Sequence, residues 1–401
     1  MKTFPMGGVH PSENKLSCAK PIEVLPLPDV VTIPLAQHIG APAVAKVAKG
    51  DRVLTGQLIA EAGSFMSANI HSPISGTVTA VDMVVNGQGL RQMMITIKRE
   101  GDDWAEGIDR SEALVKVCSF SAQEIIAKIK DAGIVGMGGA TFPTHVKLSV
   151  PPGKKAECVI INGVECEPYL TSDHRTMLEH GEELVVGVTI LMKAVGVGKA
   201  YIGIENNKPD AIAHLTKIAA GYKGIEVVPL KVMYPQGGEK QLIAAVMGRQ
   251  VPPPPALPID VGAVVCNAST TVAVYQAVLK NKPLIERVVT VTGKSVKEPK
   301  NLEDQAIMEG DKELKAWDAI ARYMKSFDDT DGNGISNVPE YYETTHGRKV
   351  VDESRNVIDL VKNPNKFSVM IVGIVLVLIL IIILLVVLIR KLIKKRRRKK
   401  K

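Results

Sequence analysis

Residues 121–295 alternate between helix-like and strand-like segments, and this alternation limits the fold more than any other feature of the chain. Strands that alternate with helices favour a largely parallel sheet covered by helices, so we predict a central α/β domain over residues 120–297. Ligands of such sheets bind beyond the carboxyl ends of the strands, where we expect Asn162. The expected helices lie at 122–132, 183–194, 209–220, 239–247 and 270–279, and the expected strands at 158–161, 200–204, 225–230, 263–266 and 287–292.

Residues 1–110 are predicted to form a separate β-rich domain, because short apolar runs alternate there with Gly and Pro turns. Segments 47–53 and 74–78 resemble the hairpins of biotinyl/lipoyl-like barrel-sandwich domains. Those carrier domains present a modifiable lysine in a tight turn, but the turn region 64–69 contains no lysine. We therefore predict a barrel-sandwich hybrid that is a structural relative of the carriers and carries no swinging arm.

Four glycines crowd the segment 133–139, and Lys147 follows shortly afterwards. Glycine lets backbone N–H groups approach a ligand closely, and successive N–H groups can form a concave anion site. The segment is not a Walker A motif, because Lys147 falls too late for that spacing. Spacing alone leaves two interpretations open, a phosphate-binding loop and a structural turn.

The net charge of +8 is dominated by the last residues of the chain. Segment 390–401 holds ten Lys and Arg, so the remainder carries a net charge of −2. The basic pI is therefore no argument for nucleic-acid binding, and the 4% aromatic content also argues against base stacking. We predict no nucleic-acid partner.

Segment 367–389 is almost wholly apolar over 23 residues, which is long enough for a helix to cross a bilayer. We predict a single transmembrane helix there, with the lipid bilayer as a partner, rather than a buried core helix. The basic tail 390–401 should lie in the cytoplasm, where it either fixes the orientation or recognises lipids.

Residues 304–366 are predicted to form a polar, helix-leaning segment with a calcium-loop-like turn. Asp329, Asp331, Asn333 and Glu340 satisfy the spacing of oxygen ligands in such loops. Pro339 stands where an exiting helix should begin, so a solvated turn is the alternative interpretation.

The five cysteines are widely spaced and odd in number, which predicts reduced thiols. The sequence contains no C-x-x-C, so it gives no ligand motif for zinc or an iron–sulfur cluster.

Several separated segments together resemble one protein family. They read G-M-G-G-A-T-F-P-T at 136–144, I-N-G-V-E-C-E-P-Y at 161–169, Y-P-Q-G-G-E-K at 234–240 and V-C-N-A-S-T at 265–270. In order and rough spacing they resemble the flavin- and NADH-binding domain of the complex I flavoprotein subunit. The resemblance to the RnfC/RsxC subunit of the Rnf/Rsx ion-translocating electron-transport complex is closer, since G-G-V-H-P at 7–11, P-L-A-Q-H-I-G at 34–40 and H-S-P-I-S-G at 71–76 also match.

The resemblance covers roughly residues 1–300 and implies FMN and NADH binding in a membrane electron-transport complex with other subunits as partners. It implies that the FMN phosphate is held by Gly136, Gly138, Gly139 and Lys147. Contacts to flavin or ribityl groups would come from Asn162, Tyr234, Asn267 and Thr270. The NADH side would be shaped by Glu165, Glu167 and Glu239. Val164 and Gly238 stand where the complex I subunit has acidic residues.

The chain also departs from the family pattern. The family carries two motifs for [4Fe-4S] clusters, and these motifs are absent here. The resemblance places the flavin domain on the cytoplasmic side of the cell membrane, yet the basic tail prefers the same side and one span cannot place both there. The alternative to an NADH-oxidising subunit is a non-catalytic, membrane-anchored fusion or truncated scaffold without the iron–sulfur electron exit.

Overall fold

The computed structural model describes residues 1–291 apart from Met6 and residues 87–88. The predicted polar segment 304–366 with its calcium-loop residues, the transmembrane helix 367–389 and the basic tail 390–401 lie outside the described residues and stay predictions. Within the described ranges, no helix is long and apolar enough to cross a membrane. The same ranges hold no cluster of three or more His, Cys, Asp or Glu placed to bind a metal ion.

The amino-terminal part is built from antiparallel strands, as predicted. One sheet has the order β1-β7-β6-β3 and a second has the order β2-β4-β5. Their inward side chains, including Val53, Ile59, Val78 and Ile95, are fully buried and form a common core. The strands are β1 (Val30–Pro34), β2 (Val44–Ala45), β3 (Arg52–Val53), β4 (Leu58–Glu61), β5 (Ile70–His71), β6 (Gly76–Val85) and β7 (Arg91–Arg99).

The central part alternates helices and strands, and its four strands form one parallel sheet of order β10-β9-β8-β11. The strands are β8 (Cys158–Asn162), β9 (Ala200–Glu205), β10 (Ile225–Leu230) and β11 (Ala263–Asn267). The helices are α1 (Ala122–Asp131), α2 (Thr144–Leu148), α3 (Ser172–Glu179), α4 (Gly181–Val195), α5 (Pro209–Ala219), α6 (Glu239–Met247) and α7 (Ala268–Leu279), with a 3₁₀ turn η1 (Pro258–Val261). The predicted parallel α/β domain is confirmed.

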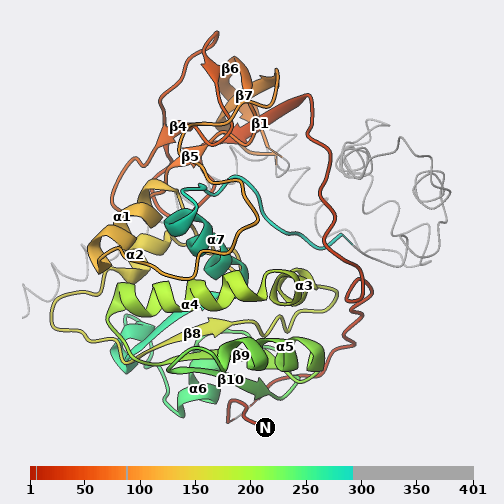
Figure 1. Cartoon of the computed structure of the whole chain (residues 1–401), viewed down its shortest axis with the longest axis vertical. Coiled ribbons are helices and arrows are strands. Elements are labelled where there is room, and N and C mark those ends of the chain that lie inside the picture. Colours follow the sequence, from red (N-terminus) through yellow and green to blue (C-terminus); the bar gives the residue numbers. More distant parts are fainter. Residues whose placement is uncertain (6, 87–88, 292–401) are drawn as a thin grey trace, which may run out of the picture. The chain divides into compact units, whose positions relative to one another are not determined.

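Alternate residues of each strand face opposite sides of the sheet, so each face has its own core. Val159 and Ile161 of β8 join a core with α1, α4 and α7. Cys158 and Ile160 join a second core with α6 on the other face. Figure 1 shows α4 and α7 above the sheet and α6 below it. Both faces are therefore covered, which explains why the strands read as continuous apolar runs.

The predicted strand at 287–292 is wrong over its described part, because residues 287–291 have no regular secondary structure. Val289 and Val291 are 56% and 55% exposed, so the apolar alternation follows the surface. Thr290 instead accepts a hydrogen bond from the backbone N–H of Thr171 at 2.9 Å, which holds this segment beside α3.

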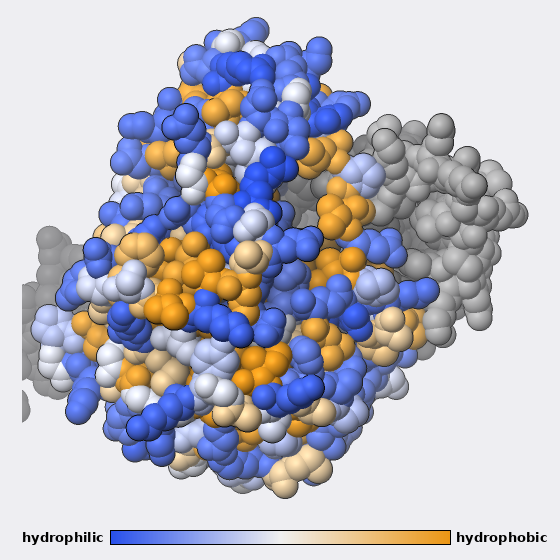
Figure 2. Space-filling view, viewed as in Figure 1, coloured by the Kyte–Doolittle hydropathy of each residue, from blue (hydrophilic) through white to orange (hydrophobic). Residues whose placement is uncertain are grey.

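The lysine-free turn of the barrel-sandwich part packs against the central part. The Asn69 side-chain amide donates to the Asp131 carbonyl at 3.1 Å, and His145 lies 3.2 Å from the Phe65 carbonyl. A Cβ on Gly133 would lie 2.2 Å from the Asn69 carbonyl oxygen. The turn that carries a modified lysine in carrier domains is thus a packing surface here. Figure 2 shows a largely hydrophilic face, with hydrophobic residues gathered in the region between α1 and α4.

Candidate functional site

The strand order reverses at β8, which places a crevice between the carboxyl ends of β8 and β11. From β8 the chain continues to β9 and β10 on one side, and β11 then adds on the other. Asn162 and Asn267, the last residues of β8 and β11, are register partners. The two amides named by the sequence are therefore side by side at the position where parallel sheets bind ligands.

Both amides are held in fixed orientations. The Asn162 side chain donates to the Gly237 carbonyl at 2.7 Å and accepts from the Val164 N–H at 3.2 Å. Asn267 caps α7, because its Oδ1 accepts from the Thr270 N–H at 3.1 Å. These contacts order the crevice floor before any ligand arrives.

Asp173 of α3 fixes the other end of the Asn267 amide. Its carboxylate accepts from Asn267 Nδ2 and from Ser269 Oγ, both at 2.6 Å. Burial raises the pKa of Asp173, while these donors lower it. Asp173 was not among the residues named from the sequence, since nothing in the spacing of the chain pairs it with β11.

The glycine loop lies against the amino terminus of α7. The Met137 N–H donates to Thr270 Oγ1 at 2.9 Å, and a Cβ on Gly138 would lie 2.6 Å from Asn267 Nδ2. A Cβ on Gly139 would meet nothing within 4 Å, so this side of the loop is open. Gly136 closes the loop by donating to the Phe142 carbonyl at 2.9 Å.

The tip of this loop offers unused donors. The backbone N–H groups of residues 138–141 have no acceptor within the part of the chain that the structure describes. Thr141 has a φ of +51°, a left-handed conformation that a β-branched residue rarely adopts. Successive free N–H groups beside a helix amino terminus suit an anionic group such as a phosphate.

Lys147 of α2 reaches the same region from the edge of the sheet. Its ammonium donates to the Val265 carbonyl at 2.9 Å and pairs with the Glu239 carboxylate at 3.0 Å. Both side chains are about one-third exposed, at 33% and 40%, so a ligand can reach them. The sequence assigned Lys147 to the phosphate and Glu239 to the dinucleotide, and the structure shows that the two are direct partners.

The loop 163–170 forms another wall, and its two carboxylates face different ways. Glu165 is 7% exposed and accepts from the N–H groups of Asp173 at 2.8 Å and His174 at 3.3 Å, at the start of α3. Burial, and then the nearby Asp173 carboxylate, raise the pKa of Glu165. Glu167 is exposed. Of the two, only Glu167 is directly accessible to a ligand.

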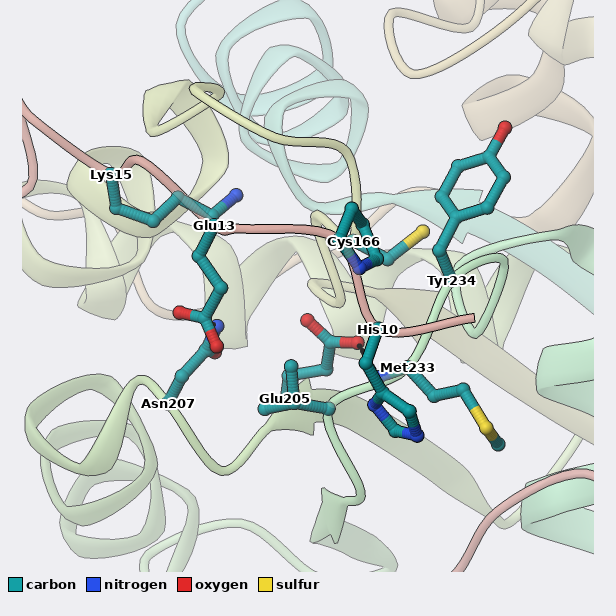
Figure 3. A pocket seen from close by; sticks show the side chains of 10 residues that line it. His10, Glu13, Lys15, Cys166, Glu205, Asn207, Met233 and Tyr234 are labelled. Atoms are coloured by element: carbon teal, nitrogen blue, oxygen red, sulfur yellow. Dashed lines mark hydrogen bonds between the residues drawn. The ribbon is translucent and has the colours of Figure 1, made fainter. Parts of the chain in front are cut away.

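A cavity of about 210 Å³ opens between this loop, the end of β9 and the amino-terminal segment. Figure 3 shows it with His10, Glu13 and Lys15 contributed by the first residues of the chain. Its other lining residues are Pro11, Cys166, Glu205, Asn207, Val232, Met233 and Tyr234. Tyr234 is 39% exposed and pairs through its backbone with Val9 at 2.8 Å in both directions. The sequence motif G-G-V-H-P at 7–11 indicated family kinship but gave no hint of this position.

A buried ion pair lies beneath the cavity. Glu205 and Lys208 are 1% and 2% exposed, and their charged atoms are 3.7 Å apart. Lys208 also donates to the Val164 carbonyl at 2.8 Å, and Glu205 accepts from the Met233 N–H at 3.0 Å. Burial lowers the pKa of Lys208 and raises that of Glu205. The pair therefore ties the 163–170 loop to the segment that leads to Tyr234.

Two family models match the chain in the regions just described. Residues 2–102 match the barrel-sandwich hybrid domain of RnfC, and residues 129–276 match the Nuo51 FMN-binding domain. The fold and the crevice thus define a protein with a barrel-sandwich domain joined to an FMN-binding-type α/β domain.

Curated relatives specify the family. The RnfC subunit of the proton-translocating ferredoxin:NAD(+) oxidoreductase complex of Clostridium ljungdahlii is 50% identical over 304 residues, covering 75% of this chain and 65% of the relative. The corresponding subunit of the Na(+)-translocating complex of Acetobacterium woodii is 44% identical, covering 74% and 67%. The corresponding subunit of the ion-translocating oxidoreductase complex of Rhodobacter capsulatus is 45% identical, covering 74% and 57%.

The chain belongs to the RnfC family, whose members are subunits of the Rnf ion-translocating oxidoreductase complexes. The matches span about two thirds or less of the relatives' own lengths. The family resemblance stated from the sequence is confirmed.

Proposed function

We propose that this chain binds FMN in the crevice between β8 and β11 and exchanges hydride with NADH there, as a subunit of a membrane electron-transport complex. The observation that carries the proposal is the glycine loop, whose free N–H groups at 138–141 lie beside Asn267, Thr270 and the α7 amino terminus. Bound FMN supplies the redox chemistry, passing between two-electron exchange with a nicotinamide and one-electron exchange with further carriers.

The residues of the chain then bind and orient. The N–H groups of Gly138 and Gly139, with the Lys147 ammonium, would hold the phosphate, while Gly136 closes the loop behind them. Asn162, Asn267 and Thr270 would contact the flavin or its ribityl chain from the sheet end, and Tyr234 from the opposite side. Lys147 would then share its ammonium between the phosphate and Glu239.

The dinucleotide side is proposed for Glu167 and Glu239, which are exposed or partly exposed, with Glu165 ordering the loop from beneath. Hydride exchange requires no acid or base from the protein, so positioning and local charge are what these residues supply. The printed names of two relatives pair ferredoxin with NAD(+), which is consistent with a nicotinamide dinucleotide at this site. We place the domain on the cytoplasmic side of the cell membrane, with other subunits of the complex as partners.

The test is flavin binding followed by reduction. The full chain, purified in detergent, is titrated with FMN, and quenching of flavin fluorescence gives the dissociation constant. NADH is then added without oxygen while the visible flavin absorbance is followed. Saturable binding and bleaching by NADH support the proposal. Colourless protein without FMN affinity would instead support the non-catalytic scaffold, and bound FMN that NADH does not bleach would overturn the dinucleotide part alone.

A further inference from the structure

Lys15 makes an unusual set of contacts for a residue near the start of a chain. Its ammonium donates to three backbone carbonyls of one distant loop, those of Glu165 at 2.8 Å, Glu167 at 2.8 Å and Leu170 at 2.7 Å. An ammonium has three donors, so these carbonyls satisfy it completely. The contacts span at least 150 residues of sequence.

The loop that Lys15 holds is conformationally strained. Glu165 has a φ of +49° and Tyr169 a φ of +69°, although neither is glycine. Left-handed backbone in non-glycine residues persists only where the surroundings fix it. Lys15 binds the carbonyl of one strained residue directly, and the Glu13 carbonyl accepts from the N–H of the other, Tyr169, at 2.8 Å.

The same amino-terminal segment is fastened along its length to the walls of the cavity. Val9 pairs with Tyr234, and the Glu13 carboxylate accepts from Asn207 at 2.9 Å. Ser17 hydrogen-bonds Thr171 at 2.7 Å. In Figure 3 the side chains of Glu13 and Asn207 face each other across the cavity edge. The segment therefore closes one side of the cavity and fixes its loop wall at the same time.

We propose that Lys15 is a positioning residue, which holds the 165–170 loop in its strained conformation and so places Glu167 at the dinucleotide side of the site. The part that concerns the dinucleotide rests on the proposed function. Lys15 itself has no donor left for a ligand, because its three donors are used by the loop. Its effect on ligand binding therefore passes through the backbone of the loop.

The test compares Lys15→Met with Lys20→Met in the full chain. Lys20 is an exposed lysine of the same segment, with no side-chain contact to the loop among the described residues. The first readout is hydrogen exchange at the backbone amides of residues 165–171. We expect exchange about tenfold faster in Lys15→Met, because several hydrogen bonds to a charged group are lost, and unchanged exchange in Lys20→Met.

The second readout separates positioning from general damage. We expect the FMN dissociation constant of Lys15→Met to stay within about twofold of the parent, because the glycine loop is untouched, and the KM for NADH to rise about tenfold. Lys15→Arg is the second variant, should the methionine variant fold poorly. Its planar guanidinium cannot direct donors to three converging carbonyls, so intermediate exchange rates are expected.

Unchanged loop exchange in both Lys15 variants would overturn the proposal, as would an equal loss of FMN and NADH binding. If the parent protein binds no NADH, the proposed function fails, and the exchange measurement still decides whether Lys15 positions the loop.

Discussion

Two loops face each other across the crevice, and they reach unusual backbone conformations by different means. The loop 136–144 relies on glycines, which adopt tight turns and leave room for a ligand. The loop 163–170 places Glu165 and Tyr169 in left-handed conformations and relies on distant residues to keep them there. The first loop carries its conformation in its own sequence, whereas the second receives it from the tertiary structure.

The difference extends to the polar groups that each loop leaves open. The glycine loop keeps the N–H groups of residues 138–141 without acceptors among the described residues. The other loop has three carbonyls bound by Lys15 and its buried carboxylate, Glu165, bound by the start of α3. One loop is therefore prepared to receive an anion, and the other is a supporting wall with its polar groups already satisfied.

The comparison is tested most severely at Gly138. A Cβ there would lie 2.6 Å from Asn267 Nδ2, and Asn267 cannot move without breaking its bonds to Asp173 and Thr270. Overpacking of this kind costs about 1–3 kcal/mol, so Gly138→Ala should weaken FMN binding about tenfold or more. Fluorescence titration with FMN measures the loss.

Gly198→Ala is the matched control, because a Cβ at Gly198 would meet nothing within 4 Å. The control should bind FMN like the parent. Equal affinity for FMN in Gly138→Ala and Gly198→Ala would show that the close approach at Gly138 is irrelevant to the site.

Lys147→Met should have the next largest effect. The substitution removes the ammonium beside the free N–H groups, and a hydrogen bond to a charged group contributes about 1.5–3 kcal/mol. We expect FMN affinity to fall about tenfold, with a small change in stability, because the exposed pair with Glu239 is worth at most about 1 kcal/mol.

Lys154→Met is the control for this charge removal. Lys154 also pairs with a carboxylate, that of Asp260, but on η1. A similar loss of FMN affinity in both variants would mean that overall charge, and not the position of Lys147, controls binding.

The fold was largely predictable because its signals are local. Apolar strand-like runs between amphipathic segments predicted β8, β9, β10 and β11 nearly to the residue. The error at 287–291 has a physical cause: alternating apolar residues look alike in a strand and along a protein surface. Helix α3 was missed because its apolar pattern is short and it follows a loop without a clear cap.

The candidate site was predictable only in part. Asn162 and Asn267 could be placed because strand ends can be read from the sequence and parallel strands end at one edge. Asp173 and Lys15 could not, because their roles depend on contacts made across 94 and 150 residues of sequence. The glycine loop was visible, but the two open interpretations needed the free N–H groups to separate them.

Asp173→Ala tests how the two loops are joined. The carboxylate links α3, which begins behind the 163–170 loop, to Asn267 and Ser269 beside the glycine loop. Two donors then lose their acceptor, so we expect a loss of about 1–3 kcal/mol in unfolding free energy and a several-fold loss in FMN affinity. Asp210→Asn, which releases His174 on another side of α3, should leave FMN affinity unchanged. If both variants weaken FMN binding equally, α3 supports the fold without orienting Asn267.

Glu165→Gln should give the smallest effect, and it separates the loops by pH. Burial and the Asp173 carboxylate raise the pKa of Glu165 in the folded chain. Above the pKa of the unfolded chain, about 4.3, the folded state then binds more protons than the unfolded state, so this residue makes stability fall as pH rises toward its folded pKa. A neutral glutamine removes that fall. The unfolding free energy of Glu165→Gln, measured by urea denaturation at several pH values, should therefore improve relative to the parent as pH increases. Glu167→Gln changes an exposed carboxylate of the same loop and should follow the parent curve. Parallel curves for Glu165→Gln and the parent would mean that the buried carboxylate does not resist ionisation. The 163–170 loop would then lack the charge sensitivity that distinguishes it from the glycine loop.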